Sequence, residues 1–145
     1  MDSNIDSDQY VVVPGITAIG FPSPQHIRPD GTFGRGPEGK WCDLSPSKYP
    51  ILKSEVDLCQ QWITQFCKPR KTPSRWDSYA LKHLVERCCG NYVSNGAFIA
   101  AAIAAGYAPL HTSGTNARFA FWIHEDGFKG SSGYIDLRRA TNGYY

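Results

Sequence analysis

The chain lacks the short motifs that point most directly to a cofactor or a metal. None of its five cysteines lies in a CxxC or CxxH spacing, and Cys88 and Cys89 are adjacent, which is not typical of a secreted disulfide framework. No GxxxxGK[ST] motif occurs, and the glycine-rich run at 30–40 does not lead from a predicted strand into a helix. We therefore expect no cofactor and no metal site, with the cysteines as buried thiols.

Membrane segments are missing as well. The N-terminal region has no basic stretch followed by an apolar one, and no apolar run approaches the roughly 20 residues that span a bilayer. We therefore expect a cytoplasmic protein with no membrane partner. At 145 residues, with 41% hydrophobic and 19% charged side chains, the composition is typical of one globular domain with a core of its own.

Charge is absent from residues 97–105, which read AFIAAAIAA. A helix that is apolar on every side is either buried or in contact with a partner. Ser94 or Asn95 can cap its start and Gly106 follows its last turn, so we predict a helix between them. Ala101 and Ala104 would give this helix a smooth surface that a partner protein can approach closely.

Two amphipathic helices are predicted upstream, over 54–67 and 78–89, because apolar residues recur there at spacings of three and four. Pro69 ends the first, and Ser54 with Asp57 resembles a capping box at its start. Asp77 or Ser78 caps the second, which ends at Gly90. The apolar positions are Val56, Cys59, Trp62, Ile63 and Phe66 in the first helix and Ala80, Leu81, Leu84, Val85 and Cys88 in the second.

The remaining regular structure is predicted to be β. Residues 107–123 read as a hairpin with its turn at 113–116, and short strands are expected at 10–13, 16–19 and 134–137. The fold expected is therefore α+β: a three-helix core of helix-turn-helix type followed by a β-hairpin. We divide the chain into a long irregular N-terminal arm with short strands, residues 1–50, and a single globular domain, residues 51–145.

Positive charge gathers in one segment. Residues 67–90 hold six basic and two acidic side chains, whereas residues 1–66 hold five basic and eight acidic ones. In a winged helix-turn-helix arrangement these cations would lie near phosphates, although a solvated basic loop without a partner is the alternative. The candidate nucleic-acid contacts are Lys68, Arg70, Lys71, Arg75, Arg118, and Ser94 and Asn95 at the start of the apolar helix.

One cluster has side chains suited to acid–base chemistry. His83 and Glu86, three residues apart, share a helix face with Lys82 close by, so the carboxylate could orient the imidazole. No nucleophile is clearly paired with them, and an exposed helix surface with ordinary ion pairs is the alternative interpretation. We therefore treat His83, Glu86 and Lys82 as weak catalytic candidates.

The segment from Lys71 to Phe121 contains the pattern SYxLKHxxE at 78–86, the run YVSNGAFIAAAIAAGY at 92–107, and Asn116 with Phe119. In these features it resembles small uncharacterised proteins of phages and other mobile elements. It implies a setting and not a mechanism. Two roles suit that setting: an accessory protein that binds DNA, and an inhibitor that docks on a host defence complex.

The leading hypothesis is a non-enzymatic accessory or regulatory protein that associates with nucleic acid. The first alternative is a protein-binding, anti-CRISPR-like inhibitor of a host protein or ribonucleoprotein complex, which would use Ala101, Ala104 and Trp76 as its contact surface. The second alternative is an enzyme that uses the His83–Glu86 pair.

Overall fold

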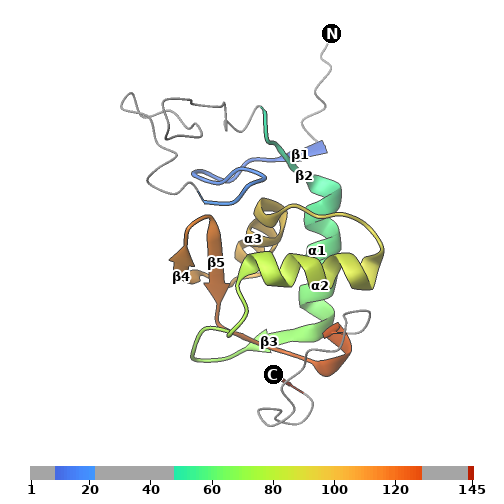
Figure 1. Ribbon diagram of the computed structural model, residues 1–145, viewed down its shortest axis with the longest axis vertical. Helices are drawn as coiled ribbons and strands as arrows, with labels where there is room; N and C mark the ends of the chain where they lie inside the picture. Colours follow the sequence, from blue (N-terminus) through green and yellow to red (C-terminus); the bar gives the residue numbers. More distant parts are fainter. Residues whose placement is uncertain (1–8, 22–47, 129–143) are drawn as a thin grey trace.

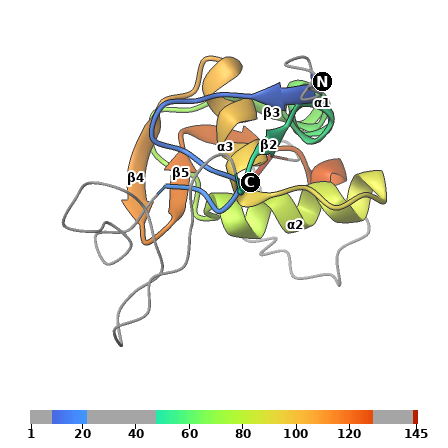
Figure 2. The ribbon, with the colours of Figure 1, turned by 90° about the horizontal axis from the view of Figure 1, so that it is seen from above.

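The computed structural model describes residues 9–21, 48–128 and 144–145. Three helices form the centre of the molecule: α1 (Lys53–Phe66), α2 (Ser78–Cys89) and α3 (Asn95–Ala104). Figures 1 and 2 show α1 and α3 side by side, with α2 laid across them. The helices agree with the three predicted from the periodicity of apolar residues, and none in the described part is long and apolar enough to cross a membrane.

The ends of α2 and α3 are stabilised by the residues that the sequence predicts. The Asp77 carboxylate accepts a hydrogen bond from the Ala80 amide at 3.0 Å, and the Ser94 hydroxyl accepts one from the Ala97 amide at 3.0 Å. Gly90 ends α2 in the left-handed conformation, with φ of 75°. Local hydrogen bonding therefore determines where both helices begin.

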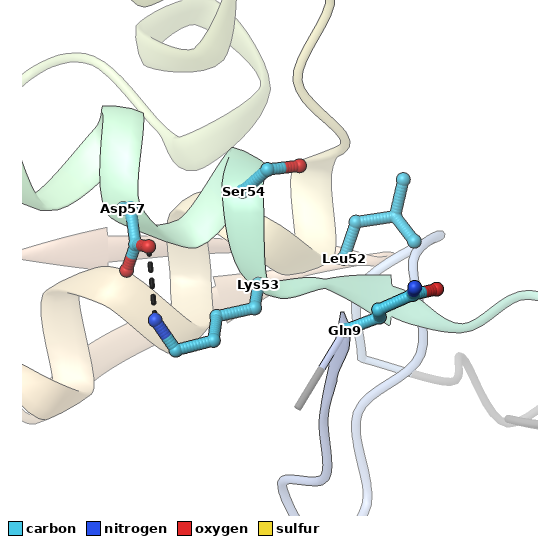
Figure 3. Close-up of a pocket in the computed structure, with 5 residues that line it drawn as sticks. All are labelled: Gln9, Leu52, Lys53, Ser54 and Asp57. Atoms are coloured by element: carbon cyan, nitrogen blue, oxygen red, sulfur yellow. Dashed lines mark hydrogen bonds and ion pairs between the residues drawn. The ribbon is translucent and has the colours of Figure 1, made fainter. Parts of the chain in front are cut away.

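The start of α1 differs from the prediction. Leu52 precedes the helix and no side chain caps it, so Ser54 and Asp57 form no capping box. The Asp57 carboxylate instead lies 3.0 Å from the Lys53 amine, one turn earlier (Figure 3). Both partners are about half exposed, so this ion pair is worth at most about 1 kcal/mol.

Three pairs of short antiparallel strands surround the helices. β1 (Tyr10–Val11) pairs with β2 (Ile51–Leu52) at one end of the helical layer, and β3 (Cys67–Pro69) lies at the other end (Figure 1). β3 pairs with β6 (Phe121–Ile123), and β4 (Pro109–Ser113) pairs with β5 (Asn116–Phe119). A 3-10 helix, η3 (Glu125–Phe128), follows β6. The predicted α+β class is confirmed.

The predicted hairpin forms, but it is shorter than expected. Its turn is correct, with Gly114 at φ of 61°, whereas the strand predicted to continue to residue 123 breaks at Ala120. The break arises because the chain changes partner there: β5 pairs with β4, while β6 pairs with β3. The connector after β3 follows this change, since the Arg70 amide donates to the Ala120 carbonyl at 3.1 Å.

The described part of the N-terminal region belongs to the same body as the helices. The Gly96 amide donates to the Ala18 carbonyl at 3.0 Å, and a Cβ at Gly96 would lie 1.8 Å from the Thr17 carbonyl oxygen. Only glycine permits this approach of residues 16–18 to the start of α3. The β1–β2 pair likewise joins residues 10–11 to residues 51–52.

Of the two strands predicted in that region, only Tyr10–Val11 forms one, and residues 13–20 make isolated bridges instead. The strand predicted at 134–137, the glycine-rich run at 30–40 and most of the irregular arm lie outside the described residues.

Candidate nucleic-acid interface

The β3–β6 pair has a buried face and an outer face. Phe121 and Ile123 are fully buried against the helices, so the side chain between them, Trp122, points to the other side. The register places Lys68 opposite Trp122. Residues 144–145 extend the pair on the far edge of β6, because Ile123 and Tyr145 exchange backbone hydrogen bonds of 2.9 and 2.8 Å.

Cations lie on aromatic rings across this outer face. The guanidinium carbon of Arg70 is 4.4 Å from the centre of the Trp122 ring, and the Lys68 amine is 4.0 Å from the centre of the Tyr144 ring. The Tyr144 ring in turn meets the His124 ring edge to face, with centres 5.0 Å apart. We call these five residues, Lys68, Arg70, Trp122, His124 and Tyr144, the outer β3–β6 face.

The lysine and arginine side chains of the outer β3–β6 face pair with no described carboxylate, whereas Nδ1 of His124 lies 3.7 Å from the Asp126 carboxylate. Among the residues that the structure describes, none of Lys68, Arg70, Lys71 and Arg118 forms an ion pair with Asp or Glu. Lys68 and Lys71 are exposed, and Arg70 is half-buried. The electrostatic condition for attracting phosphate is therefore met here.

Arg118 has a different role from the cations of the connector. Its guanidinium donates to the backbone carbonyl of Ser74 at 3.2 Å and also to that of Arg75. These bonds hold the connector against β5. The Arg75 guanidinium lies 5.3 Å from the Trp76 ring centre, so it extends the pattern of cations on rings beyond the outer β3–β6 face.

Ser94 and Asn95 are wrongly predicted as nucleic-acid contacts, because both are buried at 4% and 5% exposure. Ser94 caps α3, and the Asn95 side-chain amide donates to the Ile19 carbonyl at 2.9 Å and to the Thr115 carbonyl at 3.1 Å. Eight of the ten residues of α3 are buried. This helix therefore has no outer face with which to read a DNA groove, as a helix-turn-helix recognition helix must.

The alanine surface predicted as a partner contact is only partly accessible. Ala101 is fully buried, whereas Ala104, one turn later, is exposed. Ala101 is thus a core residue, and its prediction as a partner contact is wrong. Trp76 is half-buried and packs on the Phe128 ring, with ring centres 5.0 Å apart.

The acid–base candidates form one connected cluster on α2. The Glu86 carboxylate accepts from the Lys82 amine at 3.0 Å and from the Val93 amide at 3.2 Å, and it lies 2.9 Å from Nδ1 of His83. Burial alone would raise the pKa of Glu86, but the hydrogen bonds from Lys82 and Val93, the Lys82 charge and the His83 hydrogen bond together lower it.

Two members of this cluster, Lys82 and Glu86, bond to the backbone of Val93 in the loop between α2 and α3. Lys82 is 5% exposed and also donates to the Val93 carbonyl at 3.2 Å. His83, held by Glu86 and flanked by the Tyr79 ring at 4.7 Å, is the only member of the trio that is more than a third exposed. Lys82 and Glu86 thus connect the helix to the loop that follows it, and we assign them no catalytic role.

Sequence reasoning identified Lys68 and Arg70 but missed the aromatic half of the outer β3–β6 face. Trp122 did carry a signal, since it alternates with Phe121 and Ile123 in a strand whose apolar residues face inward. No pattern in the sequence pointed to His124 or Tyr144, because only the pairing of residues 123 and 145 brings them beside Lys68.

Comparison with models of protein families, with curated proteins and with solved structures finds no match to this chain. The resemblance to proteins of mobile elements therefore stays a prediction. Within the described ranges, no three His, Cys, Asp or Glu side chains are grouped as metal ligands would be.

Proposed function

We propose that this protein associates with nucleic acid without catalysing a reaction, as an accessory or regulatory protein of a phage or another mobile element. The observation that carries the proposal is the outer β3–β6 face, where Lys68 and Arg70 lie on aromatic rings and pair with no described carboxylate. Cations bind phosphates and release their counterions, while rings contact bases or sugars.

The ring contacts leave hydrogen-bond donors for phosphate oxygens. The Lys68 amine faces a ring, which attracts its charge without occupying all three N–H groups. Arg70 donates to the Thr72 hydroxyl through Nε at 3.0 Å and through Nη2 at 2.6 Å. These bonds orient the guanidinium against Trp122, and no residue in the described ranges accepts from Nη1, which we expect to contact a phosphate.

The test is the salt dependence of binding, measured by fluorescence anisotropy with a labelled oligonucleotide. Each lost phosphate contact should reduce the slope of log affinity against log salt by about 0.7 to 0.9. We expect weaker binding and a shallower slope for the Lys68→Ala/Arg70→Ala double variant. Lys48→Ala/Lys53→Ala is the matched control, since it removes the same charge where the chain enters α1, whereas Lys68 and Arg70 follow the end of that helix.

Equal slopes for the two double variants would contradict the proposal, because a non-specific effect of net charge would then explain the binding. A shallower slope for Lys68→Ala/Arg70→Ala, together with an unchanged slope for the control, would support phosphate contacts on the outer β3–β6 face.

The second candidate is a protein-binding inhibitor of a host protein or ribonucleoprotein complex. It is favoured by Tyr79 and Tyr92, which are 52% and 67% exposed and whose ring centres lie 5.6 and 4.6 Å from the Lys82 amine. Tyrosine is enriched at protein interfaces. This role predicts a complex with a host component that survives nuclease treatment and is lost in the Tyr79→Ala/Tyr92→Ala variant; persistence of the complex in that variant would dismiss the surface.

A further inference from the structure

The helix that a helix-turn-helix protein would insert into duplex DNA, α3, is not placed to read it. Direct readout of a duplex needs a helix or a two-stranded ribbon inserted into a groove, with polar side chains at its tip. The start of α3 is covered by residues 16–20, since the Gly96 amide bonds to Ala18 and the Asn95 side chain bonds to Ile19. Its polar cap therefore faces the protein interior.

The outer β3–β6 face instead presents flat groups. Trp122 and the Arg70 guanidinium lie one over the other at 4.4 Å, whereas the Tyr144 and His124 rings meet edge to face, with centres 5.0 Å apart. A nucleobase stacks favourably on an aromatic ring or on a guanidinium plane. In a duplex the faces of the bases already stack on one another, so these groups add affinity only when the bases are unpaired.

The two cations lie close enough together to contact phosphates of one nucleic-acid strand. Lys68 is the register partner of Trp122, and Arg70 lies on the Trp122 ring itself. A phosphate held by either cation is therefore adjacent to a base that contacts the ring. Cations and rings therefore lie side by side on this face, as they do in grooves that bind single strands.

Resting on the proposed function, we infer that the outer β3–β6 face binds single-stranded nucleic acid in preference to duplex, with a base stacked against the Trp122–Arg70 pair. Lys68 and Arg70 contact the flanking phosphates. Because stacking does not depend on the identity of the base, the preference for a particular sequence is weak.

The experiment compares two labelled probes by fluorescence anisotropy at one salt concentration: an oligothymidylate of about 15 nucleotides and a duplex of the same length. We expect the single strand to bind at least roughly 10-fold more tightly. Trp122→Leu should weaken single-strand binding roughly 10-fold or more and leave duplex binding unchanged, because it removes the stacking surface and no charge.

Two further variants sharpen the result. Trp122→Phe keeps a ring and should retain most of the affinity for the single strand. Tyr92→Leu removes an exposed ring from the α2 side of the molecule and should change neither affinity. The comparison of probes with the unchanged protein decides the preference even if Trp122→Leu does not fold.

The outcomes separate this inference from the proposed function. Equal or tighter binding of the duplex overturns the inference and leaves nucleic-acid association standing. If Trp122→Leu weakens the binding of the single strand and of the duplex by the same factor, the inference is also overturned, because stacking on unpaired bases cannot contribute to duplex binding. Failure of both probes to bind removes the proposed function, and the inference with it.

Discussion

Lys82 and Lys68 both place an amine beside tyrosine rings, yet they do so in two regions that differ in burial. Lys82 lies in the helical layer at 5% exposure, where its amine bonds to the Glu86 carboxylate and to the Val93 carbonyl. Lys68 is exposed on the outer β3–β6 face, and a ring of Tyr144 is its described contact.

The difference shows which cations are available for a ligand. A buried amine must have hydrogen-bond partners, since an unpaired buried charge is strongly destabilising. The donors of Lys82 are therefore engaged in connecting α2 to the loop before α3. An exposed amine on a ring keeps most of its hydration and can exchange water for phosphate. Burial thus separates a structural cation from a candidate binding cation of the same chemical type.

The largest effect that we predict tests the buried layer at α3. Ala101→Arg places a charge in the core and should cost more than about 4 kcal/mol, a large fraction of the roughly 5–15 kcal/mol by which an ordinary domain is stable. Ala104→Arg, at an exposed position one turn away, should leave stability within about 0.5 kcal/mol. Urea denaturation of both variants measures this; a stable, folded Ala101→Arg protein would contradict the burial of this helix.

The second prediction compares the two lysines directly. Lys82→Met leaves the Glu86 carboxylate without its nearest cation and should destabilise the protein by about 3 kcal/mol. Lys68→Met should cost less than about 1 kcal/mol, because it removes only an exposed cation–ring contact. Similar unfolding midpoints for the two variants in urea would contradict the view that Lys82 stabilises the fold and that Lys68 does not.

The third prediction concerns pH. Glu86→Gln should cost about 2 kcal/mol at neutral pH by weakening the hydrogen bonds from Lys82 and Val93. The pKa of Glu86 is lowered from its ordinary value of 4.5, so its carboxylate stabilises the fold above that pH, and this stability is lost as the pH falls through the lowered pKa.

The difference in stability between the original protein and Glu86→Gln should therefore become smaller below about pH 4.5. Thermal unfolding across a pH series measures this difference. Glu125→Gln, which changes an exposed carboxylate, is the control and should show no such gap at neutral pH. A gap for Glu86→Gln that stays constant down to acid pH would show that its charge is not what stabilises the α2–α3 connection.

The smallest effect is expected at the join between the two regions. Arg118→Met removes the hydrogen bonds to the Ser74 and Arg75 carbonyls and should cost about 1 kcal/mol. Lys71→Met, an exposed cation of the same connector, should cost nothing measurable. The unfolding midpoint of each variant checks this. An equal shift for both would mean that Arg118 does not hold the connector.

Much of the helical part could be predicted from the sequence because its signals are local. The cap residues Asp77 and Ser94 and the stop at Gly90 act within one turn of the helices that they bound. The turn at Gly114 depends on four neighbouring residues. The capping box at Ser54 was not formed, because Leu52 enters α1 directly from its pairing in β2 and Asp57 pairs with Lys53.

The candidate site could be predicted only in part. The concentration of Lys and Arg after α1 is visible in the sequence, but their availability is not. Ser94 and Asn95 were expected to face a ligand, and the packing of residues 16–20 over α3 buries them. Burial of a polar residue depends on which distant segment covers it, and no local pattern specifies that segment.

The sequence by itself determined the three helices, the caps of α2 and α3, the hairpin turn and the segment that carries positive charge, since each follows from residues within a few positions of one another. Only the tertiary structure decided that β6 leaves the hairpin to pair with β3, and that Tyr144 reaches Lys68. Strand pairing joins residues far apart in the chain by backbone hydrogen bonds that every sequence can form. The side chains of one strand therefore do not specify which other strand it pairs with.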